Sequence, residues 1–176
     1  MRLPRQKLPG GGCYYHLMNR VAGRKEWRPL SDLDREYGMN LVGRPSSYYL
    51  LEIIAVCWMG NHFHIVLYEP HRDELPDGDE IIRRHNSFYG EDRPGKHIHA
   101  GNREQVEQVR RNMTDISHFM KNFRQQMTGY TNRKYDRCGT LWADRLKSTI
   151  LEERYALRQA VTYIELNPVR TKRNQK

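Results

Sequence analysis

Two histidines separated by one residue, His62 and His64, lie near the middle of the chain. They belong to a segment, residues 62–68, in which apolar residues alternate with the histidines, a valine and a tyrosine. Such alternation is typical of a β-strand with one buried face, and residues two apart on a strand point to the same side. The two imidazoles could therefore converge on one cation. Ordinary sheet faces also carry exposed or hydrogen-bonded histidines, so the spacing alone leaves both interpretations open.

A second pair with the same spacing, His97 and His99, shows how little the spacing means by itself. It lies in a polar stretch where no apolar alternation fixes the direction of the side chains. The second pair is therefore the weaker candidate for a metal site.

A tyrosine and an asparagine four residues apart, Tyr163 and Asn167, lie near the end of a helix predicted over residues 152–167. Four residues are about one helical turn, so a hydroxyl and an amide oxygen would lie on the same face. The simpler interpretation is that Tyr163 packs at the edge of the core and that Asn167 caps the helix before Pro168, which is expected to stop it. The residues expected to point inward are Leu157, Ala160, Val161 and Ile164.

The positive charge of the chain is concentrated in its C-terminal part. The formal net charge is +9, yet residues 1–104 carry 15 Lys and Arg against 14 Asp and Glu, whereas residues 105–176 carry 15 against 7. A regional excess of positive charge attracts phosphates and is a feature of nucleic-acid-binding proteins. A basic surface that binds nothing stays an open alternative, because net charge bears on association and not on fold.

Basic side chains are interleaved with aromatic ones in the segment from Lys121 to Lys147. This mixture can hold phosphates and stack unpaired bases, so the segment is the predicted DNA-contacting region. The candidate contacts are Lys121, Arg124, Arg133, Lys134, Arg137, Trp142, Arg145 and Lys147, with Tyr130 and Tyr135 among them.

Composition restricts the class of protein. With 38% hydrophobic and 29% charged residues over 176 positions, the chain is expected to form one globular domain. No apolar run approaches the roughly 20 residues of a membrane span, and the start lacks the apolar segment of a secretory signal. A cytoplasmic protein without a membrane partner is expected. The cysteines, Cys13, Cys57 and Cys138, fit neither a disulfide framework nor a zinc motif.

The periodicity predicts an α+β fold, with a small antiparallel sheet and helices packed mainly on one face. The strand at 50–58 is apolar enough to be buried on both faces. A helix should begin at Ser31, with Asp34 at the position of a capping-box carboxylate, and end near residues 43–45. The predicted strands are 13–21, 50–58, 62–68 and 140–151.

Two longer segments complete the pattern. Residues 69–104 are rich in charge, proline, glycine and histidine without a sustained period, which predicts a surface insertion outside the core. Residues 105–127 predict one long helix whose apolar stripe suits a core or a dimer seam better than a cofactor site, and residues 130–139 predict a turn. The stripe consists of Val106, Val109, Met113, Ile116, Met120, Phe123 and Met127.

Several blocks of this sequence resemble those of the REP-associated tyrosine transposases, which belong to the HUH endonuclease superfamily. The resemblance covers nearly the whole chain except residues 69–104. The segment around the histidines is similar to the metal-binding strand of the superfamily. The blocks are YHLMNR at 15–20, WMGNHFHIV at 58–66, GTLW at 139–142, RLKS at 145–148 and YIELNPVR at 163–170.

The resemblance implies a single ferredoxin-like domain of the HUH transposase type over residues 1–176. It implies that Tyr163 is the nucleophile and that Asn167 is the third ligand, beside His62 and His64, of a divalent metal, Mg²⁺ or Mn²⁺. Related enzymes often carry glutamine at the position of Asn167, so the asparagine would have a shorter reach.

The implied reaction is the cutting and rejoining of single-stranded DNA through a 5′-phosphotyrosine intermediate, at hairpin or REP-like sequences. Dimers with shared active sites and monomers both occur among relatives, so a homodimer is one of two open states. Two other functions also stay open. One is a catalytically silent or domesticated DNA-binding regulator on the same fold, and the other is a metal-dependent hydrolase that uses water in place of Tyr163.

Overall fold

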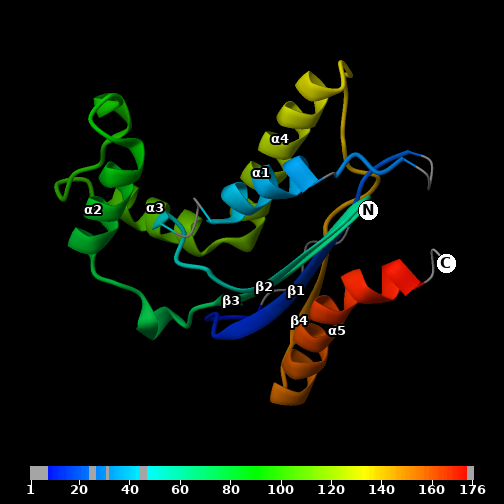
Figure 1. Cartoon of the computed structure of the whole chain (residues 1–176). Coiled ribbons are helices and arrows are strands. Elements are labelled where there is room, and N and C mark those ends of the chain that lie inside the picture. The colour runs from blue at the N-terminus through cyan, green and yellow to red at the C-terminus, as the bar shows by residue number, and fades with distance from the viewer. Residues whose placement is uncertain (1–7, 24–26, 31, 44–46, 174–176) are drawn as a thin grey trace, which may run out of the picture.

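A four-stranded antiparallel sheet forms the centre of the protein (Figure 1). The strand order β2-β3-β1-β4, with antiparallel neighbours throughout, is that of a ferredoxin-like fold and confirms the predicted α+β class. The computed structural model describes the backbone of residues 8–23, 27–30, 32–43 and 47–173, and the side chains of these residues except 32–33 and 167–173. The strands are β1 (Cys13–Arg20), β2 (Glu52–Met59), β3 (His62–Glu69) and β4 (Lys147–Leu151).

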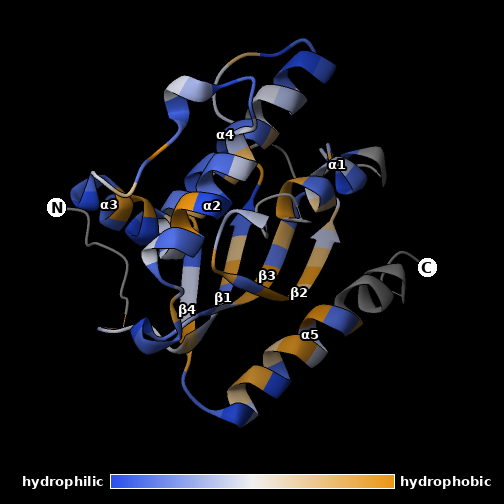
Figure 2. Cartoon of the chain, turned by 90° about the vertical axis from the view of Figure 1, so that its left-hand side faces the viewer, coloured by the Kyte–Doolittle hydropathy of each residue, from blue (hydrophilic) through white to orange (hydrophobic). Residues whose placement is uncertain are grey.

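The helices cover the two faces of the sheet unequally. α1 and α4 pack over the main core, and of the described helices only α5 crosses the opposite face (Figures 1 and 2). A smaller second core lies under α5. The helices are α1 (Asp32–Gly43), α2 (Gly78–Tyr89), α3 (Arg103–Thr114), α4 (Ile116–Lys134) and α5 (Arg154–Arg173), with short 3-10 turns η2 (Arg72–Glu74) and η3 (Pro94–Lys96).

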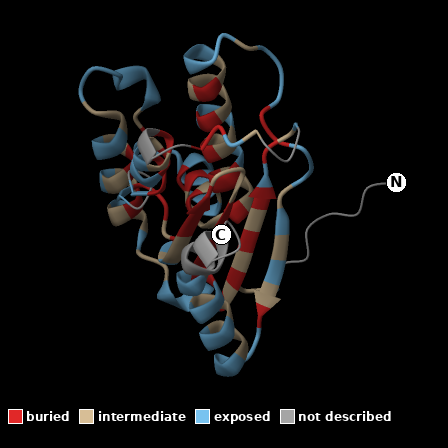
Figure 3. Cartoon of the chain, turned by 45° about the vertical axis from the view of Figure 1, so that its right-hand side comes forward, coloured by how far each residue is buried: buried red, intermediate tan, exposed pale blue. Residues whose placement is uncertain are grey.

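The side chains of the central strand β3 alternate between the two faces of the sheet, as the sequence predicts. Phe63, Ile65 and Leu67 are fully buried in the main core, while Val66 packs in the second core beneath α5. His64 lies on the same face as Val66 because the two are separated by one residue. Figure 3 shows buried residues gathered on the sheet and on the helix faces that pack against it. The alternation therefore places His64 between the sheet and α5.

The strand predicted at 50–58 is not buried on both faces. β2 lies at the edge of the sheet, where Glu52 and Ile54 are exposed and only the last three residues, Cys57 to Met59, are buried. The register also shifts between Ile53 and Ala55. An unbroken apolar run does not distinguish an edge strand from a central one, because burial depends on neighbours that the run itself does not specify.

The sequence predicts that segment 69–104 is a surface insertion outside the core, and this is wrong in part. The side chain of Asp77 accepts a hydrogen bond from the Glu80 amide and caps α2, which packs against α3. Ile81 and Ile98 are buried in the main core. Because only a few residues of the segment turn inward, its polar majority obscures the apolar positions that anchor it.

The predicted single helix over 105–127 is two helices. The stripe is buried core as predicted, but the chain breaks at Asp115, whose carboxylate accepts hydrogen bonds from the Ser117 and His118 amides and caps α4. An N-cap aspartate ends one helix and begins the next without interrupting the apolar spacing. α4 then continues to Lys134, so half of the turn predicted at 130–139 is helical.

The C-terminal part differs from the prediction in two places. Only Lys147–Leu151 of the strand predicted at 140–151 joins the sheet, while Trp142 makes a single bridge to Val21. The last helix runs through Pro168 to Arg173 instead of stopping at the proline. A proline costs a helix one hydrogen bond and disturbs the preceding turn, but it does not have to end the helix.

At the start of α1, the capping box predicted for Ser31 and Asp34 stays a prediction. Ser31 lies outside the described residues. The carboxylate of Asp34 is fully buried and accepts hydrogen bonds from the Lys134 ammonium at 2.7 Å and the Tyr135 hydroxyl at 3.2 Å. Asp34 therefore joins α1 to the end of α4. Within the described residues, no helix is long and apolar enough to cross a membrane.

Candidate active site

The histidines at the start of β3 lie side by side on the face that α5 crosses. The ring centroids of His62 and His64 are 5.2 Å apart, and the rings meet edge to face. The Nδ1 atom of His62 lies 2.8 Å from the side-chain oxygen of Asn61. An amide oxygen only accepts hydrogen bonds, so His62 carries its proton on Nδ1 and keeps a lone pair on Nε2. The turn residue Asn61 thus prepares His62 to act as a ligand.

His64 is held in a drier environment than His62. Only 5% of the residue is exposed, and its Nδ1 atom lies 2.9 Å from Nε2 of His16 on β1. Its Nε2 atom is buried and has no hydrogen-bond partner among the described residues. Desolvation by burial, reinforced by the charges that His16 and His62 would carry, lowers the pKa of His64 to about 4. The ring is therefore neutral near pH 7, and a buried nitrogen without a partner is a position suited to a ligand.

The last helix brings Tyr163 to this pair. Ile164 is buried in the second core and anchors α5 to the sheet, while the adjacent Tyr163 remains 41% exposed. The Tyr163 ring lies edge to face with the ring of His64, with centroids 5.6 Å apart. The hydroxyl-bearing side chain therefore lies against His64 and is also open to solvent. The side chain of Asn167, the predicted third ligand, lies outside the described residues.

The two imidazoles fit a divalent cation. Burial lowers the pKa of both His62 and His64, and the nearby Arg20 charge lowers that of His62 further, so protons compete weakly for the ring nitrogens. Each ring also has a partner on its other nitrogen, an arrangement that is usual for metal-bound histidines. Among the described residues, no group of three His, Cys, Asp or Glu side chains is arranged so that it could hold a metal ion. The remaining ligands would have to be amide oxygens, water or substrate oxygens.

The second histidine pair does not form a comparable arrangement. The Nε2 atom of His97 donates to the carbonyl oxygen of Gly90 at 2.9 Å, and His99 is exposed. A nitrogen that donates to a backbone carbonyl has no lone pair to offer a metal. The absence of apolar alternation around His97 and His99 therefore correctly indicates the weaker candidate for a metal site.

A groove of about 780 Å³ lies beside Tyr163 between α5 and the sheet. Tyr155, the second residue of α5, is 67% exposed at this groove, and His16 contributes to its wall from β1. Apolar and polar side chains share the lining, as a site for an unpaired nucleotide requires. The lining residues are His16, Leu151, Tyr155, Ala156, Arg158, Gln159, Ala160, Thr162, Tyr163 and Leu166.

Three of the predicted DNA contacts lie together in a second groove, of about 550 Å³, along α4. Lys121 is exposed there, and the Arg124 guanidinium lies 5.7 Å from the centre of the Trp142 ring. The indole of Trp142 donates to the Arg124 carbonyl oxygen and is only 4% exposed. Trp142 therefore forms the floor of this groove and is too buried to stack on a base.

The other predicted contacts are dispersed. Lys134 is engaged by the buried Asp34 carboxylate, and Arg137 stacks over the ring of Trp27 at 4.6 Å. Arg133 and Arg145 are exposed. Lys134 and Arg137 thus have structural contacts that the pattern of basic and aromatic residues does not reveal.

Strand register places Lys147 near the histidines. Lys147 pairs with Met18 on β1, and Met18 pairs with His64 on β3, so the three lie in one row across the same face of the sheet. In the next row toward the strand ends, Arg20 pairs with His62 and is exposed. Two exposed, positively charged side chains, those of Lys147 and Arg20, therefore lie next to the histidine pair on this face of the sheet.

His16 and Arg20, which both lie in the YHLMNR block, are site residues that the motifs alone do not indicate. The signal that could have found them is the period of two in β1, which puts positions 14, 16, 18 and 20 on one face. Nothing in the sequence alone says that this face is shared with His62 and His64.

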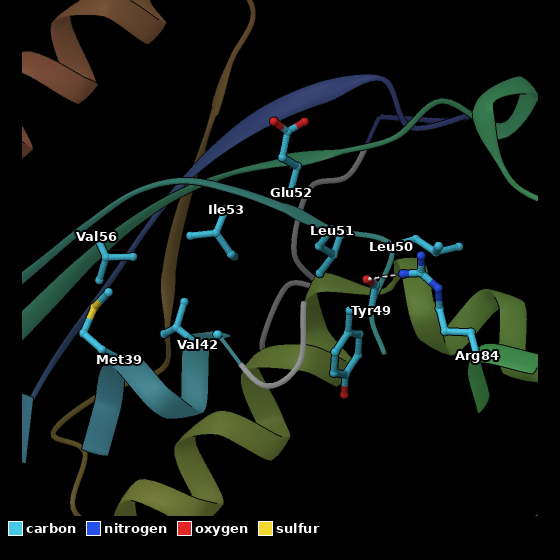
Figure 4. A pocket seen from close by; sticks show the side chains of 10 residues that line it. Met39, Val42, Tyr49, Leu50, Leu51, Glu52, Ile53, Val56 and Arg84 are labelled. Atoms are coloured by element: carbon cyan, nitrogen blue, oxygen red, sulfur yellow. Dashed lines mark hydrogen bonds between the residues drawn. The ribbon is translucent and has the colours of Figure 1, made fainter. Parts of the chain in front are cut away.

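Another cavity, of about 560 Å³, lies on the main-core side between α1 and the start of β2 (Figure 4). Apolar side chains such as Met39, Val42 and Ile53 line most of it, and Arg84 donates to the Tyr49 carbonyl oxygen at its rim. It holds no pair of groups suited to acid, base or nucleophilic chemistry. The site with Tyr163 is the stronger candidate for catalysis.

The fold corresponds to that of a solved structure. A REP-associated tyrosine transposase, solved bound to a REP hairpin, matches 97% of this chain and 74% of its own with a TM-score of 0.61 at 15% sequence identity. The chain therefore has the fold of a REP-associated tyrosine transposase. A candidate transposase from Deinococcus radiodurans R1 matches 94% of this chain and 96% of its own at 14% identity, but its TM-score of 0.41 is too low to support an argument. No protein-family model and no curated protein sequence matches the chain.

Proposed function

We propose that this protein is a single-tyrosine DNA transposase that cuts and rejoins single-stranded DNA with Tyr163 as the nucleophile. The observation that carries the proposal is the contact between Tyr163 and His64 on a ferredoxin-like sheet, with a lone pair on His62 Nε2 and a buried His64 Nε2 that has no hydrogen-bond partner among the described residues. A tyrosine that only packed at the core edge would not need to contact one imidazole of a histidine pair. The fold shared with the REP-associated tyrosine transposase supports the same conclusion.

The reaction follows from the position of Tyr163. Its oxygen forms a bond to the scissile phosphorus while the bond from phosphorus to the 3′ oxygen breaks. The phenol loses its proton, the 3′ oxygen gains one, and the products are a 5′-phosphotyrosine and a free 3′-hydroxyl. Because the covalent bond conserves the energy of the phosphodiester, another 3′-hydroxyl can attack it and rejoin strands without ATP.

His62 and His64, with Asn167 as the proposed third ligand, would hold Mg²⁺ or Mn²⁺. Such an ion, when bound, polarises a phosphate oxygen and offsets the charge that develops on it. The exposed Arg20 guanidinium adds a fixed positive charge at the same face and would bind the phosphate next to the cut. The protein residues therefore orient the phosphate for attack by Tyr163.

The proposed path of the DNA connects the groove on α4 with the catalytic face. Leu146 lines that groove, and the next residue, Lys147, lies in the row of Met18 and His64. Leu146 directly precedes β4, so the edge of the sheet at β4 lies between the two surfaces. A strand held by Lys121 could pass around this edge to the catalytic face, and the substrate would be a hairpin with a single-stranded flank.

The test of the proposal is covalent capture of DNA. The protein is incubated with end-labelled single-stranded hairpins drawn from repeats of the source genome, with Mn²⁺ or Mg²⁺, and resolved on a denaturing gel. A protein–DNA adduct should form with wild type, require metal and disappear with Tyr163→Phe. Tyr155→Phe, which removes another exposed hydroxyl from the same helix, should still form it.

Other outcomes identify the alternatives. Cleavage that persists in Tyr163→Phe without an adduct would indicate a metal-dependent hydrolase. Binding without any adduct or nick, across the pool and both metals, would indicate a catalytically silent DNA-binding protein on this fold.

A further inference from the structure

A third histidine, His16, lies diagonal to His64 on the neighbouring strand β1, opposite Val66. The two rings are stacked, with centroids 5.2 Å apart and planes inclined by 23°, and His16 Nε2 lies 2.9 Å from His64 Nδ1. β1 and β3 pair along their whole length, so the backbone fixes this arrangement. The contact is therefore built into the centre of the sheet.

The position of one proton in this contact decides what His64 can do. If His64 Nδ1 carries the proton and donates it to His16, then His64 Nε2 holds a lone pair. If His16 Nε2 is the donor, the neutral His64 ring must carry its proton on Nε2. That N–H would be buried without a partner among the described residues, and it would repel a cation. Only the first arrangement gives His64 the lone pair of a ligand.

We infer that His16 is a positioning residue of the metal site, which accepts the hydrogen bond from His64 Nδ1 and so directs the Nε2 lone pair of His64 toward the cation. The inference rests on the proposed function, because it requires a cation at His62 and His64. Metal-bound histidines commonly have such a partner, and its loss typically costs 10–100-fold in metal affinity. Asn61 has the equivalent position beside His62.

His16 is not placed to be a ligand of the same cation. Its Nε2 atom is occupied by His64, and no group of three His, Cys, Asp or Glu side chains among the described residues is arranged so that it could hold a metal ion. A histidine retained only to fill space would be replaced by leucine without consequence for metal binding. A direct ligand and a space-filling residue are therefore both distinguishable from a positioning residue.

The test measures metal binding and proton position without DNA. Mn²⁺ dissociation constants are determined on metal-free protein by the EPR signal of free Mn²⁺, for wild type, His16→Leu and His16→Gln. His16→Leu should raise the dissociation constant about 10–100-fold. His16→Gln can present an amide oxygen to His64 Nδ1 and should stay within about threefold of wild type. Urea unfolding in EDTA shows whether each variant is folded.

The proton is located separately by long-range ¹H–¹⁵N correlation NMR of the metal-free protein. Wild type and His16→Gln should show His64 protonated on Nδ1, and His16→Leu should lose this preference. A folded His16→Leu that binds Mn²⁺ as wild type does, or a wild-type His64 protonated on Nε2, would overturn the inference.

The outcome for His16 is separable from that for the proposed function. Wild type that binds Mn²⁺ and loses affinity in His16→Leu, yet forms no DNA adduct, would support His16 and contradict the transposase. A DNA adduct from wild type together with unchanged Mn²⁺ binding in His16→Leu would support the transposase and contradict the role of His16.

Discussion

Because His64 is buried as a neutral ring, acid should lower the free energy of unfolding. The part of this loss that is due to His64 can be measured with a single substitution. The pKa of His64 is lowered from 6.5 to about 4 in the folded protein, chiefly by desolvation. Between these two values the unfolded chain binds a proton that the folded chain excludes, so stability is present above pH 6.5 and is lost as the pH falls toward 4. At about 1.4 kcal/mol per pH unit, the loss attributable to His64 is on the order of 3 kcal/mol.

The assay is urea unfolding followed by tryptophan fluorescence, in EDTA, at several pH values between 7 and 4. Wild type is compared with His64→Gln, which cannot titrate, and with His99→Gln, which removes an exposed histidine. The decline in unfolding free energy from pH 7 to 4 should be smaller by about 3 kcal/mol in His64→Gln and unaltered in His99→Gln. Equal declines in all three proteins would refute the conclusion that His64 is buried and neutral.

Three further results are expected. Lys134→Met should lower the urea midpoint, because the buried Asp34 carboxylate loses its ammonium partner, whereas Arg133→Met on the exposed side of the same turn should leave the midpoint within error. Asp115→Ala should lower the unfolding free energy by about 1 kcal/mol through loss of the α4 cap, as read by thermal or urea unfolding. Lys121→Ala should weaken single-stranded DNA binding and reduce the slope of log affinity against log salt by about 0.7, in titrations at several salt concentrations. An unaltered slope would remove Lys121 from the DNA path.

The fold was predictable where one period dominates the sequence. Alternation at Phe63, Ile65 and Leu67 fixed the buried face of β3, and with it the face shared by His62 and His64. The apolar residues of α5 were predicted inward, and that packing is what leaves Tyr163 beside the histidines. These features depend on local spacing, which a sequence states directly.

The rest depends on contacts between distant segments. Asp115 breaks a helix without disturbing its apolar stripe, and Pro168 lies inside a helix that it was expected to end. The bond between His16 and His64 joins residues 48 positions apart, and the pair of Lys134 with Asp34 joins residues 100 apart. No local sequence pattern predicts which distant residue a polar side chain will contact.

The central claim, that Tyr163 is the nucleophile, is tested most directly by locating the nucleotide that remains on the protein. Trypsin should release residues 159–170 as one peptide in which Tyr163 is the only tyrosine, while Tyr155 falls in a separate peptide. After reaction with a hairpin substrate, metal and nuclease digestion, mass spectrometry should find the nucleotide mass on the 159–170 peptide at Tyr163. The same mass on the peptide that carries Tyr155, or on any other residue, would contradict this account of the site.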